Sequence, residues 1–153
     1  MSAGPAIRVR VRRLHDRPHV RLPKRASPGS AGYDLTAAIS GPVALPAGAR
    51  RSIPTGLTLE IPAGYEAQVR PRSGRALRQG LTVLNSPGTI DSDYRGEVLV
   101  LLVNLGHAAV TIQPGDRLAQ LVLAPVLEVS WEEAADPLEA TERGTGGFGS
   151  SGR

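Results

Sequence analysis

The chain has 153 residues, a length typical of one domain, and 41% of them are hydrophobic, which is enough to form a core. It contains no cysteine, which excludes disulfides and thiolate metal sites and fits a reducing compartment. The formal charge is +4, but the arginines are scattered and only 3% of residues are aromatic, so we expect no nucleic-acid partner. Because the sequence shows no signal region and no membrane-spanning run, we also expect a cytoplasmic protein with no membrane contact.

Short apolar stretches, separated by proline and glycine, follow one another along most of the chain. Several of them alternate apolar and polar residues, which is typical of a half-buried strand. The run at 97–105 is almost continuously apolar and favours a strand buried on both faces. Strands this short and this regularly interrupted predict an all-β sandwich, jelly roll or barrel. The predicted strands include residues 7–12, 43–45, 57–61, 65–69, 97–105, 110–112, 118–123 and 126–131.

Two segments depart from this strand pattern. Residues 73–79 are predicted to form one short helix, with Ser73 as a candidate N-cap and Gly80 as the stop. Near the C-terminus an acidic linker leads into a tail of glycine and serine around Phe148, which cannot form a core and should be flexible by itself. The chain is therefore expected to contain two regions: a β-sandwich domain at 1–131, and a linker with a flexible C-terminal arm at 132–153.

Asp91 is the first candidate for chemistry. It lies in the run Gly-Thr-Ile-Asp-Ser-Asp-Tyr-Arg-Gly at 88–96, directly after a strong turn signal at 85–88. An Asp-rich turn is commonly a solvated hairpin tip. The alternative is a general base that orients water, or a carboxylate linked to a metal. Tyr94 in the same turn favours the functional interpretation, because aromatic residues are scarce in this chain.

Two further segments are suited to phosphate. Arg72 and Ser73 stand at the start of the predicted helix, where free N–H groups attract anions, and Gly74 lets an anion approach the main chain. An ordinary N-cap fits the same residues. In the tail, Arg143 and Phe148 within a glycine run suit a lid over a nucleotide, although a disordered tail is the alternative. The tail also matches G-x-G-x-x-G, but we reject a dinucleotide-binding motif because no strand precedes it and no helix follows.

Asp34 and Gln120 are polar residues in strand-like surroundings. An inward-facing Asp34 needs a partner, so it is either structural or catalytic. Gln120 is either a ligand-binding group or a plain strand residue, and Asp116 and Arg117 before it are candidates for an ion pair within the turn. Three residues are not spaced like a metal site and are expected on the surface: His15, His19 and His107.

Taken together and in this order, five segments closely resemble the five motifs of the trimeric dUTP pyrophosphatases (dUTPases). The matching segments are 31–37, 71–76, 85–97, 115–121 and 143–152. The resemblance implies a jelly-roll-like β-sandwich or distorted barrel and a homotrimer whose active sites each draw on all three chains. It also implies an enzyme that hydrolyses dUTP to dUMP and pyrophosphate, which limits uracil in DNA and supplies dUMP for thymidylate synthesis.

The resemblance assigns roles to the residues of the hairpin. Asp91 matches the residue that activates the water attacking the α-phosphate. Tyr94 matches the tyrosine whose ring packs on deoxyribose and leaves no room for a 2′-hydroxyl. Asn85, with main-chain groups of the same hairpin, would read uracil. The main-chain groups belong to Gly88, Thr89 and Ile90.

The other motifs would hold the triphosphate and its metal. Arg72, Ser73, Gly74 and Gln120 match phosphate-binding residues, and Asp34 matches an aspartate that acts through water on Mg²⁺, which the triphosphate mainly holds. In the arm, the ring of Phe148 would stack on uracil, and Arg143 with Ser150 and Ser151 would hold the γ-phosphate. Gly149 is a further predicted substrate-binding residue of the arm. The arm would close over nucleotide bound at a site built by neighbouring subunits.

One departure and two rivals accompany this resemblance. The residue after Gly74 is often leucine in the family; here it is Arg75, which either adds charge near the phosphates or points to solvent. The dCTP deaminases share the fold but carry a catalytic glutamate ten residues after the equivalent of Asp91. That position is Leu101 here, and leucine cannot transfer a proton. A non-catalytic, capsid-like jelly roll would release no pyrophosphate from any nucleotide.

Overall fold

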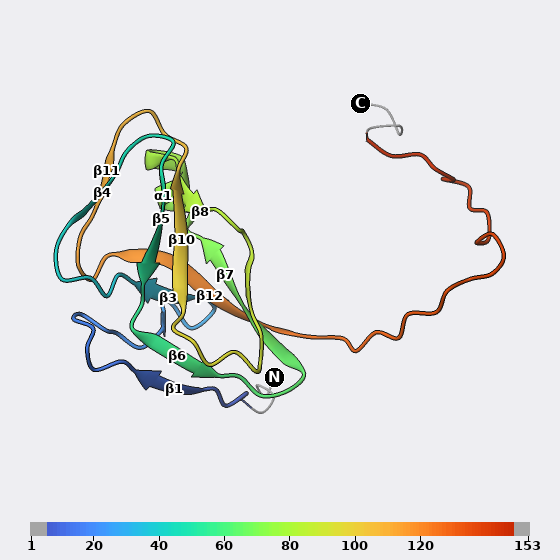
Figure 1. The fold of residues 1–153 in the computed structure, drawn as a ribbon, viewed down its shortest axis with the longest axis horizontal. Coiled ribbons are helices and arrows are strands. Elements are labelled where there is room, and N and C mark those ends of the chain that lie inside the picture. Colours follow the sequence, from blue (N-terminus) through green and yellow to red (C-terminus); the bar gives the residue numbers. More distant parts are fainter. Residues whose placement is uncertain (1–5, 149–153) are drawn as a thin grey trace.

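The computed structural model describes residues 6–148, which form a β-rich body followed by an extended C-terminal segment (Figure 1). Twelve strands and one helix make up the described body. In chain order these are β1 (Arg10–Arg13), β2 (Lys24–Arg25), β3 (Tyr33–Thr36), β4 (Val43–Leu45), β5 (Arg50–Pro54), β6 (Leu57–Glu60), β7 (Tyr65–Pro71), α1 (Ser73–Gln79), β8 (Leu81–Val83), β9 (Gly88–Ile90), β10 (Leu99–Asn104), β11 (Val110–Ile112) and β12 (Arg117–Pro125).

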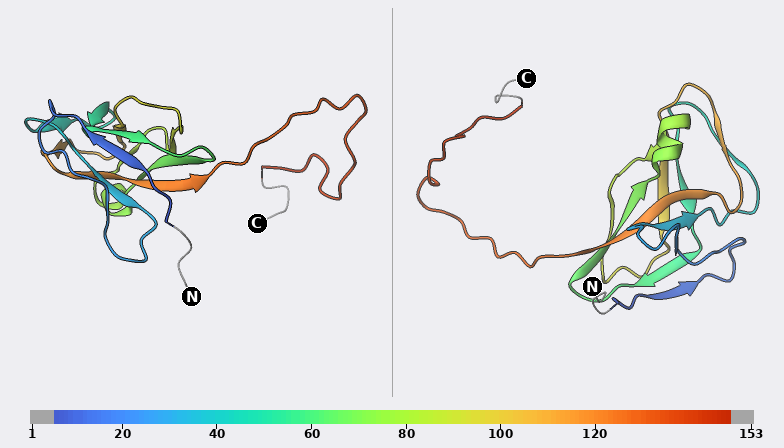
Figure 2. Two further views of the ribbon diagram at one scale, coloured as in Figure 1. Left: turned by 90° about the horizontal axis from the view of Figure 1, so that it is seen from below. Right: turned by 180° about the vertical axis from the view of Figure 1, so that it is seen from behind.

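The strands form antiparallel sheets whose neighbours are often far apart in the sequence. The largest sheet has five strands in the order β2-β3-β12-β7-β9, and a second sheet has the order β5-β10-β8. Two strand pairs, β1 with β6 and β4 with β11, complete the fold. This crossing connectivity gives a jelly-roll-like β-fold with one short helix (Figure 2), as predicted.

The core is aliphatic because the chain has few aromatic residues. Strand β6 alternates buried and more exposed residues, so that Leu57 and Leu59 face inward, and β7 does the same with Ala67 and Val69. The largest fully buried aliphatic side chains are Leu35, Leu45, Ile53, Leu57, Leu81, Leu102, Ile112, Leu118, Val98 and Val100. The predicted strands at 43–45, 57–61, 65–69 and 110–112 are thereby confirmed to within two residues at each end.

Two strand predictions need correction. Strand β10 is buried only in part, because Leu99 remains 41% exposed. The predicted strand at 126–131 does not form, and Trp131 is 92% exposed. The reason is pairing: β12 lies between β3 and β7, and its last partner on β7 is Tyr65, opposite Pro125. An apolar run beyond that point has no strand of the described chain to pair with.

Helix α1 has the predicted bounds but a different N-cap. The N-cap is Arg72, in extended conformation and without a side-chain capping bond, so Ser73 is the first helical residue. Gly80 ends the helix as predicted, in the left-handed conformation (φ 66°), and its N–H donates to the carbonyl oxygen of Ala76. The helix buries none of its residues, and at its C-terminal end the carbonyl oxygen of Gly80 accepts the N–H of Leu105 at 2.9 Å.

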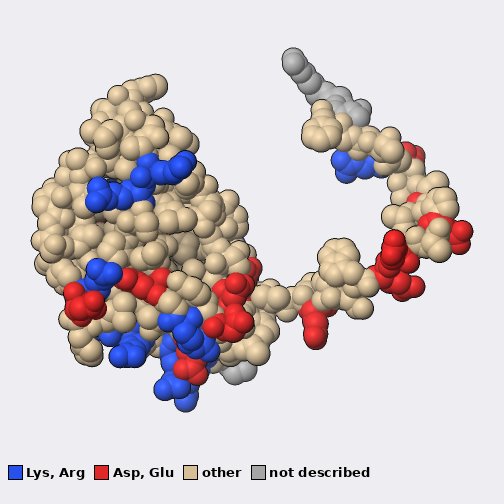
Figure 3. Space-filling model, viewed as in Figure 1, with Lys and Arg blue, Asp and Glu red and all other residues tan. Residues whose placement is uncertain are grey.

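Beyond β12 the described chain runs away from the body as an extended segment without helix or strand (Figures 1 and 2). Acidic side chains follow one another along it, whereas basic and acidic groups are mixed on the body (Figure 3). Leu127 and Leu138 are 83% and 84% exposed on this segment. Across residues 6–148, no helix has the length and apolar character that a membrane span requires.

Candidate active site

Three neighbouring strands bring Asp34, Arg72 and Gln120 together at one end of the large sheet. Gln120 on β12 lies opposite Asp34 on β3, and Arg72 follows the last residue of β7. The Asp34 carboxylate is paired with Arg72 (Nε to Oδ1, 3.3 Å) and with Arg117 (Nη1 to Oδ2, 3.2 Å). Asp34 therefore has the charged partners that its place in a strand required. Its carboxylate holds the guanidinium groups of Arg72 and Arg117 beside the helix start.

Gln120 is fixed across the end of β7. Its Nε2 donates to the carbonyl oxygen of Pro71 at 3.0 Å. Its Oε1 lies over Gly32, where a Cβ atom would overlap it. The side-chain amide is thus held just before the helix that begins at Ser73.

The helix start itself carries Ser73 and Gly74, the predicted phosphate-binding pair. Ser73 is exposed and Gly74 half-buried. The guanidinium of Arg78 lies over Gly74, since a Cβ at Gly74 would come within 3.1 Å of its Nη2. The sequence interpretation missed Arg78, although residues at i and i+4 of a helix are neighbours and this spacing could have indicated it.

The second group of predicted residues lies on the hairpin of β9. Strand β9 pairs with β7, with Val69 opposite Gly88 and Ala67 opposite Ile90. The amide of Asn85 lies against Gly88, where a Cβ would come within 2.9 Å of its Nδ2. Gly88 is buried, whereas Thr89 is exposed and Ile90 half-buried. The structure thus brings Asn85 and β9 together as predicted.

Asp91 follows β9 directly and begins a turn. Its carbonyl oxygen accepts a hydrogen bond from the N–H of Tyr94 at 3.2 Å. Asp91 and Asp93 are exposed and border an open pocket of about 970 Å³, shared with Glu66 and with Glu128 at the start of the C-terminal segment. The Asp91 carboxylate is therefore accessible to water and to a ligand.

Tyr94 is held by the residues that follow it. Its hydroxyl donates to the carbonyl oxygen of Glu97 at 3.1 Å. A Cβ at Gly96 would overlap the tyrosine hydroxyl, so the ring lies across a glycine that leaves room for it. The ring remains 43% exposed, and its position beside Asp91 is set by this local packing.

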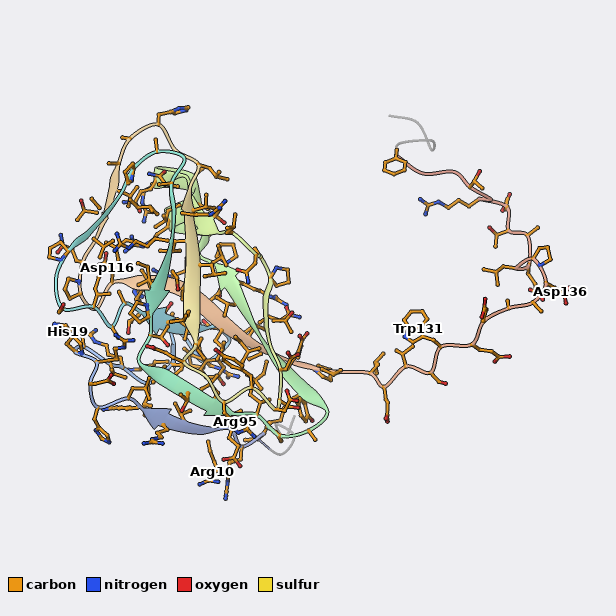
Figure 4. The ribbon with its side chains drawn as sticks, in the orientation of Figure 1. Arg10, His19, Arg95, Asp116, Trp131 and Asp136 are labelled. Atoms are coloured by element: carbon orange, nitrogen blue, oxygen red, sulfur yellow. The ribbon has the colours of Figure 1, made fainter. Side chains whose placement is uncertain are left out.

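One chain does not bring the two groups of residues together. Asp91 follows Ile90, which pairs with Ala67 near the start of β7, whereas Arg72 follows the end of β7. Continuing this register, Asp91 would face Glu66, six residues before Arg72, and this length of strand corresponds to roughly 20 Å. Figure 4 likewise places Arg95, next to the hairpin, and Asp116, which is paired with Arg75 of α1, in different parts of the body.

The arm residues lie apart from both groups. Phe148 is fully exposed, and Arg143 donates from Nε to the carbonyl oxygen of Gly146 in its own turn at 2.8 Å. Figure 4 shows Trp131 and Asp136 on the same segment, well away from the body. The remaining predicted arm residues are outside the described range: Gly149, Ser150 and Ser151.

The charged pairs near the helix differ from the sequence prediction in two respects. Asp116 and Arg117 do not pair with each other: Arg117 binds Asp34, and Asp116 binds Arg75 (Oδ2 to Nη2, 2.9 Å). Asp116 lies in the turn before β12, where its carboxylate also accepts the N–H of Gln113, whereas Arg117 is the first residue of the strand. The Arg75 side chain is only 15% exposed, so it does not point to solvent, and whether it adds charge near the phosphates stays a prediction.

Metal-ligating side chains are sparse on the described chain. Within residues 6–148, no group of three or more histidines, cysteines, aspartates or glutamates could hold a metal ion. The histidines are exposed, as predicted. Asp34 provides a single hard-oxygen carboxylate at the cationic end, which fits an Mg²⁺ ion whose other ligands are phosphate oxygens and water but not an all-protein cage.

The jelly-roll-like β-fold carries a cationic helix start that is suited to phosphate. It also carries a carboxylate on an exposed hairpin. These features define the class of protein as a nucleotide hydrolase. Residues 18–152 match the dUTPase family. The chain is 55% identical, over 95% of its length and 96% of the relative, to the deoxyuridine 5′-triphosphate nucleotidohydrolase of Bdellovibrio bacteriovorus. It is 58% identical to that of Desulfotalea psychrophila over 86% of this chain and 87% of the relative. The chain belongs to the dUTPase family and is a hydrolase that converts dUTP to dUMP.

Solved structures agree with this assignment. A mutant of the dUTPase of Staphylococcus bacteriophage 80alpha, solved with dUpNHpp, has a TM-score of 0.79 at 26% identity and covers 95% of this chain and 99% of its own. A mutant of the dUTPase from phage phi11 of S. aureus, which coordinates a structural Mg(II) ion, has a TM-score of 0.73 at 25% identity. It covers 84% of this chain and 97% of its own.

Proposed function

We propose that the dUTPase site of this protein is completed only when copies of the chain assemble, as a homotrimer with three shared sites. The observation that carries this proposal is the separation of Asp91 and Arg72 by the length of β7. A triphosphate cannot be attacked by water at one end and held at the other end of a strand roughly 20 Å long. The hairpin of one subunit must therefore face the cationic end of another.

Asp91 acts as the general base. Its carboxylate takes a proton from a water molecule, and the oxygen of that water attacks the α-phosphorus in line with the bond to the bridging oxygen. That bond breaks, the electron pair leaves with pyrophosphate, and the new P–O bond belongs to dUMP. The exposure of Asp91 on the open pocket supports this role, because water reaches it freely.

The same hairpin selects the nucleoside. Asn85 and the main-chain groups of Gly88, Thr89 and Ile90 bind uracil, since free backbone donors and acceptors imitate a pairing base. The ring of Tyr94 packs on the deoxyribose and excludes a 2′-hydroxyl. Support comes from the position of Tyr94, which its hydroxyl contact holds in the turn that begins at Asp91.

The cationic end binds the triphosphate. Arg72, the hydroxyl of Ser73, the main chain of Gly74 and the amide of Gln120 contact phosphate oxygens, since guanidinium groups and free donors match them. When bound, Mg²⁺ neutralises part of the triphosphate charge and sets the conformation of the phosphates. Asp34 would meet this ion through water, which fits its single carboxylate between two arginines.

The C-terminal arm closes over the nucleotide at a site formed by its neighbours. Phe148 stacks on uracil, Arg143 with Ser150 and Ser151 holds the γ-phosphate, and Gly149 is a further residue that binds the substrate. The exposure of Phe148 in the free chain supports this role, because the ring has no partner among the described residues of its own body. Closure then buries an apolar ring only when the ligand is present. The cytoplasmic location and the absence of a nucleic-acid or membrane partner stay predictions from composition.

Substrate assays test the chemistry. Pyrophosphate release is measured with dUTP, dTTP, dCTP and UTP, each with and without Mg²⁺. We expect appreciable turnover of dUTP only, with Mg²⁺ increasing it. Ammonia release from dCTP would instead support the deaminase alternative, and no turnover of any nucleotide would support a non-catalytic jelly roll.

A complementation experiment tests the shared site. Asp91→Asn and Arg72→Ala are prepared separately, unfolded together, and refolded as mixed oligomers. If each site takes the hairpin from one chain and the cationic end from another, about a quarter of the sites in random mixed oligomers regain both residues. Recovered turnover supports the proposal. A mixture as inactive as its two components would show that Asp91 and Arg72 act within one chain.

A further inference from the structure

Glu97 is a half-buried acidic residue whose carboxylate is fully engaged by other parts of the fold. Its Oε1 accepts the N–H of Gly56 at 2.8 Å, and its Oε2 is paired with Nη2 of Arg17 at 3.1 Å. The side chain is only 13% exposed. A carboxylate at this depth needs such partners to offset its lost hydration.

The partners of Glu97 are themselves fixed. Gly56 has a left-handed conformation (φ 69°), and a side chain there would overlap a methyl group of Val20, so only glycine fits. Its carbonyl oxygen accepts the N–H of Leu14 at 2.8 Å. Next to it, the fully buried Thr55 donates its hydroxyl to the carbonyl oxygen of Val98 at 2.6 Å. The Glu97 side chain and the backbone of the next residue, Val98, are therefore both anchored to one turn, and the carbonyl of Glu97 lies between these two contacts.

That anchored carbonyl is the acceptor for Tyr94. The tyrosine hydroxyl donates to the oxygen of Glu97 at 3.1 Å. The ring is otherwise exposed, at 43%, so this bond and the glycine under the ring are its main restraints in the chain. A shift of the Glu97 backbone would move the tyrosine ring with it.

We propose that Glu97 is a positioning residue for sugar selection: its carboxylate, through Gly56 and Arg17, fixes the carbonyl that holds Tyr94. This inference rests on the proposed function, in which the Tyr94 ring excludes a 2′-hydroxyl. The carboxylate does not touch the substrate. It sets how closely the ring lies to C2′ of the sugar, and thus the discrimination between dUTP and UTP.

Selectivity is the readout that separates this role from general stability. The ratio of kcat/KM for dUTP to kcat/KM for UTP is measured in Glu97→Gln, Glu97→Ala and Arg17→Met. A disturbed Asp91 or partial unfolding lowers both values together and cancels in the ratio. Glu97→Gln keeps an oxygen for the Gly56 N–H but loses the charge that binds Arg17. We expect the ratio to fall about tenfold in Glu97→Ala and about threefold in the other two variants, since each tenfold corresponds to about 1.4 kcal/mol of differential binding.

Glu60→Gln is the matched control, because Glu60 also pairs with an arginine, Arg10, but lies at the exposed end of strand β6 with a side chain 48% exposed. Its ratio should equal that of the unmodified protein. Tyr94→Ala separates the two levels of the argument. If Tyr94→Ala lowers the ratio while both Glu97 variants leave it unchanged, the positioning role of Glu97 is wrong and the proposed function stands. If Tyr94→Ala leaves the ratio unchanged, the role proposed for the ring is wrong and this inference falls with it.

Discussion

Arg75 and Asp116 form an ion pair, with 2.9 Å between Nη2 and Oδ2, that links α1 to the turn before β12. The same guanidinium donates from Nε to the carbonyl oxygen of Arg117 at 2.9 Å. Asp116 in turn accepts the N–H of Gln113 at 3.0 Å. Because α1 buries none of its residues, these contacts are important for holding the helix start, with Ser73 and Gly74, at a fixed distance from β12.

Arg75→Leu tests this link. Loss of a half-buried pair and a hydrogen bond should lower the free energy of unfolding by about 1 kcal/mol. The KM for dUTP should rise about threefold with kcat little changed, because the phosphate-binding end loosens while the Asp91 hairpin is untouched. Chemical denaturation and steady-state kinetics measure both effects. Arg50→Leu, which removes an exposed arginine from β5, is the control and should change neither. An unaltered KM in Arg75→Leu would show that α1 keeps its place without the pair.

Asp91→Asn should abolish most of the turnover while leaving binding intact. An amide cannot accept the proton of the attacking water, so kcat should fall roughly 10²- to 10⁴-fold. The affinity for a non-hydrolysable dUTP analogue, measured by calorimetry, should stay within about twofold, since the change is isosteric and on an exposed residue. Asp93→Asn is the control, because Asp93 is exposed in the same turn. If the two variants lose activity equally, the base is not specifically Asp91.

Removal of residues 143–153 should separate catalysis from assembly. The described part of this segment is exposed and lies away from the body, so the β-fold should be retained (Figure 1). Turnover of dUTP should fall by at least about tenfold, because closure over the substrate is lost. Light scattering gives the oligomer mass, which should decrease only by the deleted residues. Dissociation to single chains would mean that the arm holds the subunits together and does not serve as a lid.

Local pattern predicted much of the fold, whereas long-range pairing was beyond it. The strands at 57–61 and 65–69 were predicted because alternation of apolar and polar residues is a property of neighbouring positions, and α1 was predicted because Gly80 ends it. The run at 126–131 has the same apolar character but no partner strand, and no local pattern contains that information. Local propensity is overridden wherever the sheet offers no edge.

The candidate site shows the same division. The motif order predicted which residues belong to the site, and in the structure Asp34, Arg72 and Gln120 lie together at one end of the sheet. The sequence could not show that Asp91 lies at the other end of β7, since this follows from the pairing of β9 with β7. Nor could the sequence show that Arg75 forms an ion pair with Asp116, 41 positions away, because side-chain partners on different elements depend on how the strands are paired.

Gly32→Ala offers a test of Gln120 that leaves its side chain unaltered. The new Cβ would overlap Oε1 of Gln120, so the amide must turn away from the carbonyl oxygen of Pro71 to which it now donates. If Gln120 binds phosphate, its displacement should raise the KM for dUTP about tenfold, the equivalent of about 1.4 kcal/mol. Gly29→Ala is the matched control, because a Cβ there meets nothing within 4 Å. Steady-state kinetics on both variants measures the KM for dUTP, and thermal unfolding verifies that each variant is folded. Equal KM values would show that Gln120 is a plain strand residue whose position is irrelevant to the triphosphate.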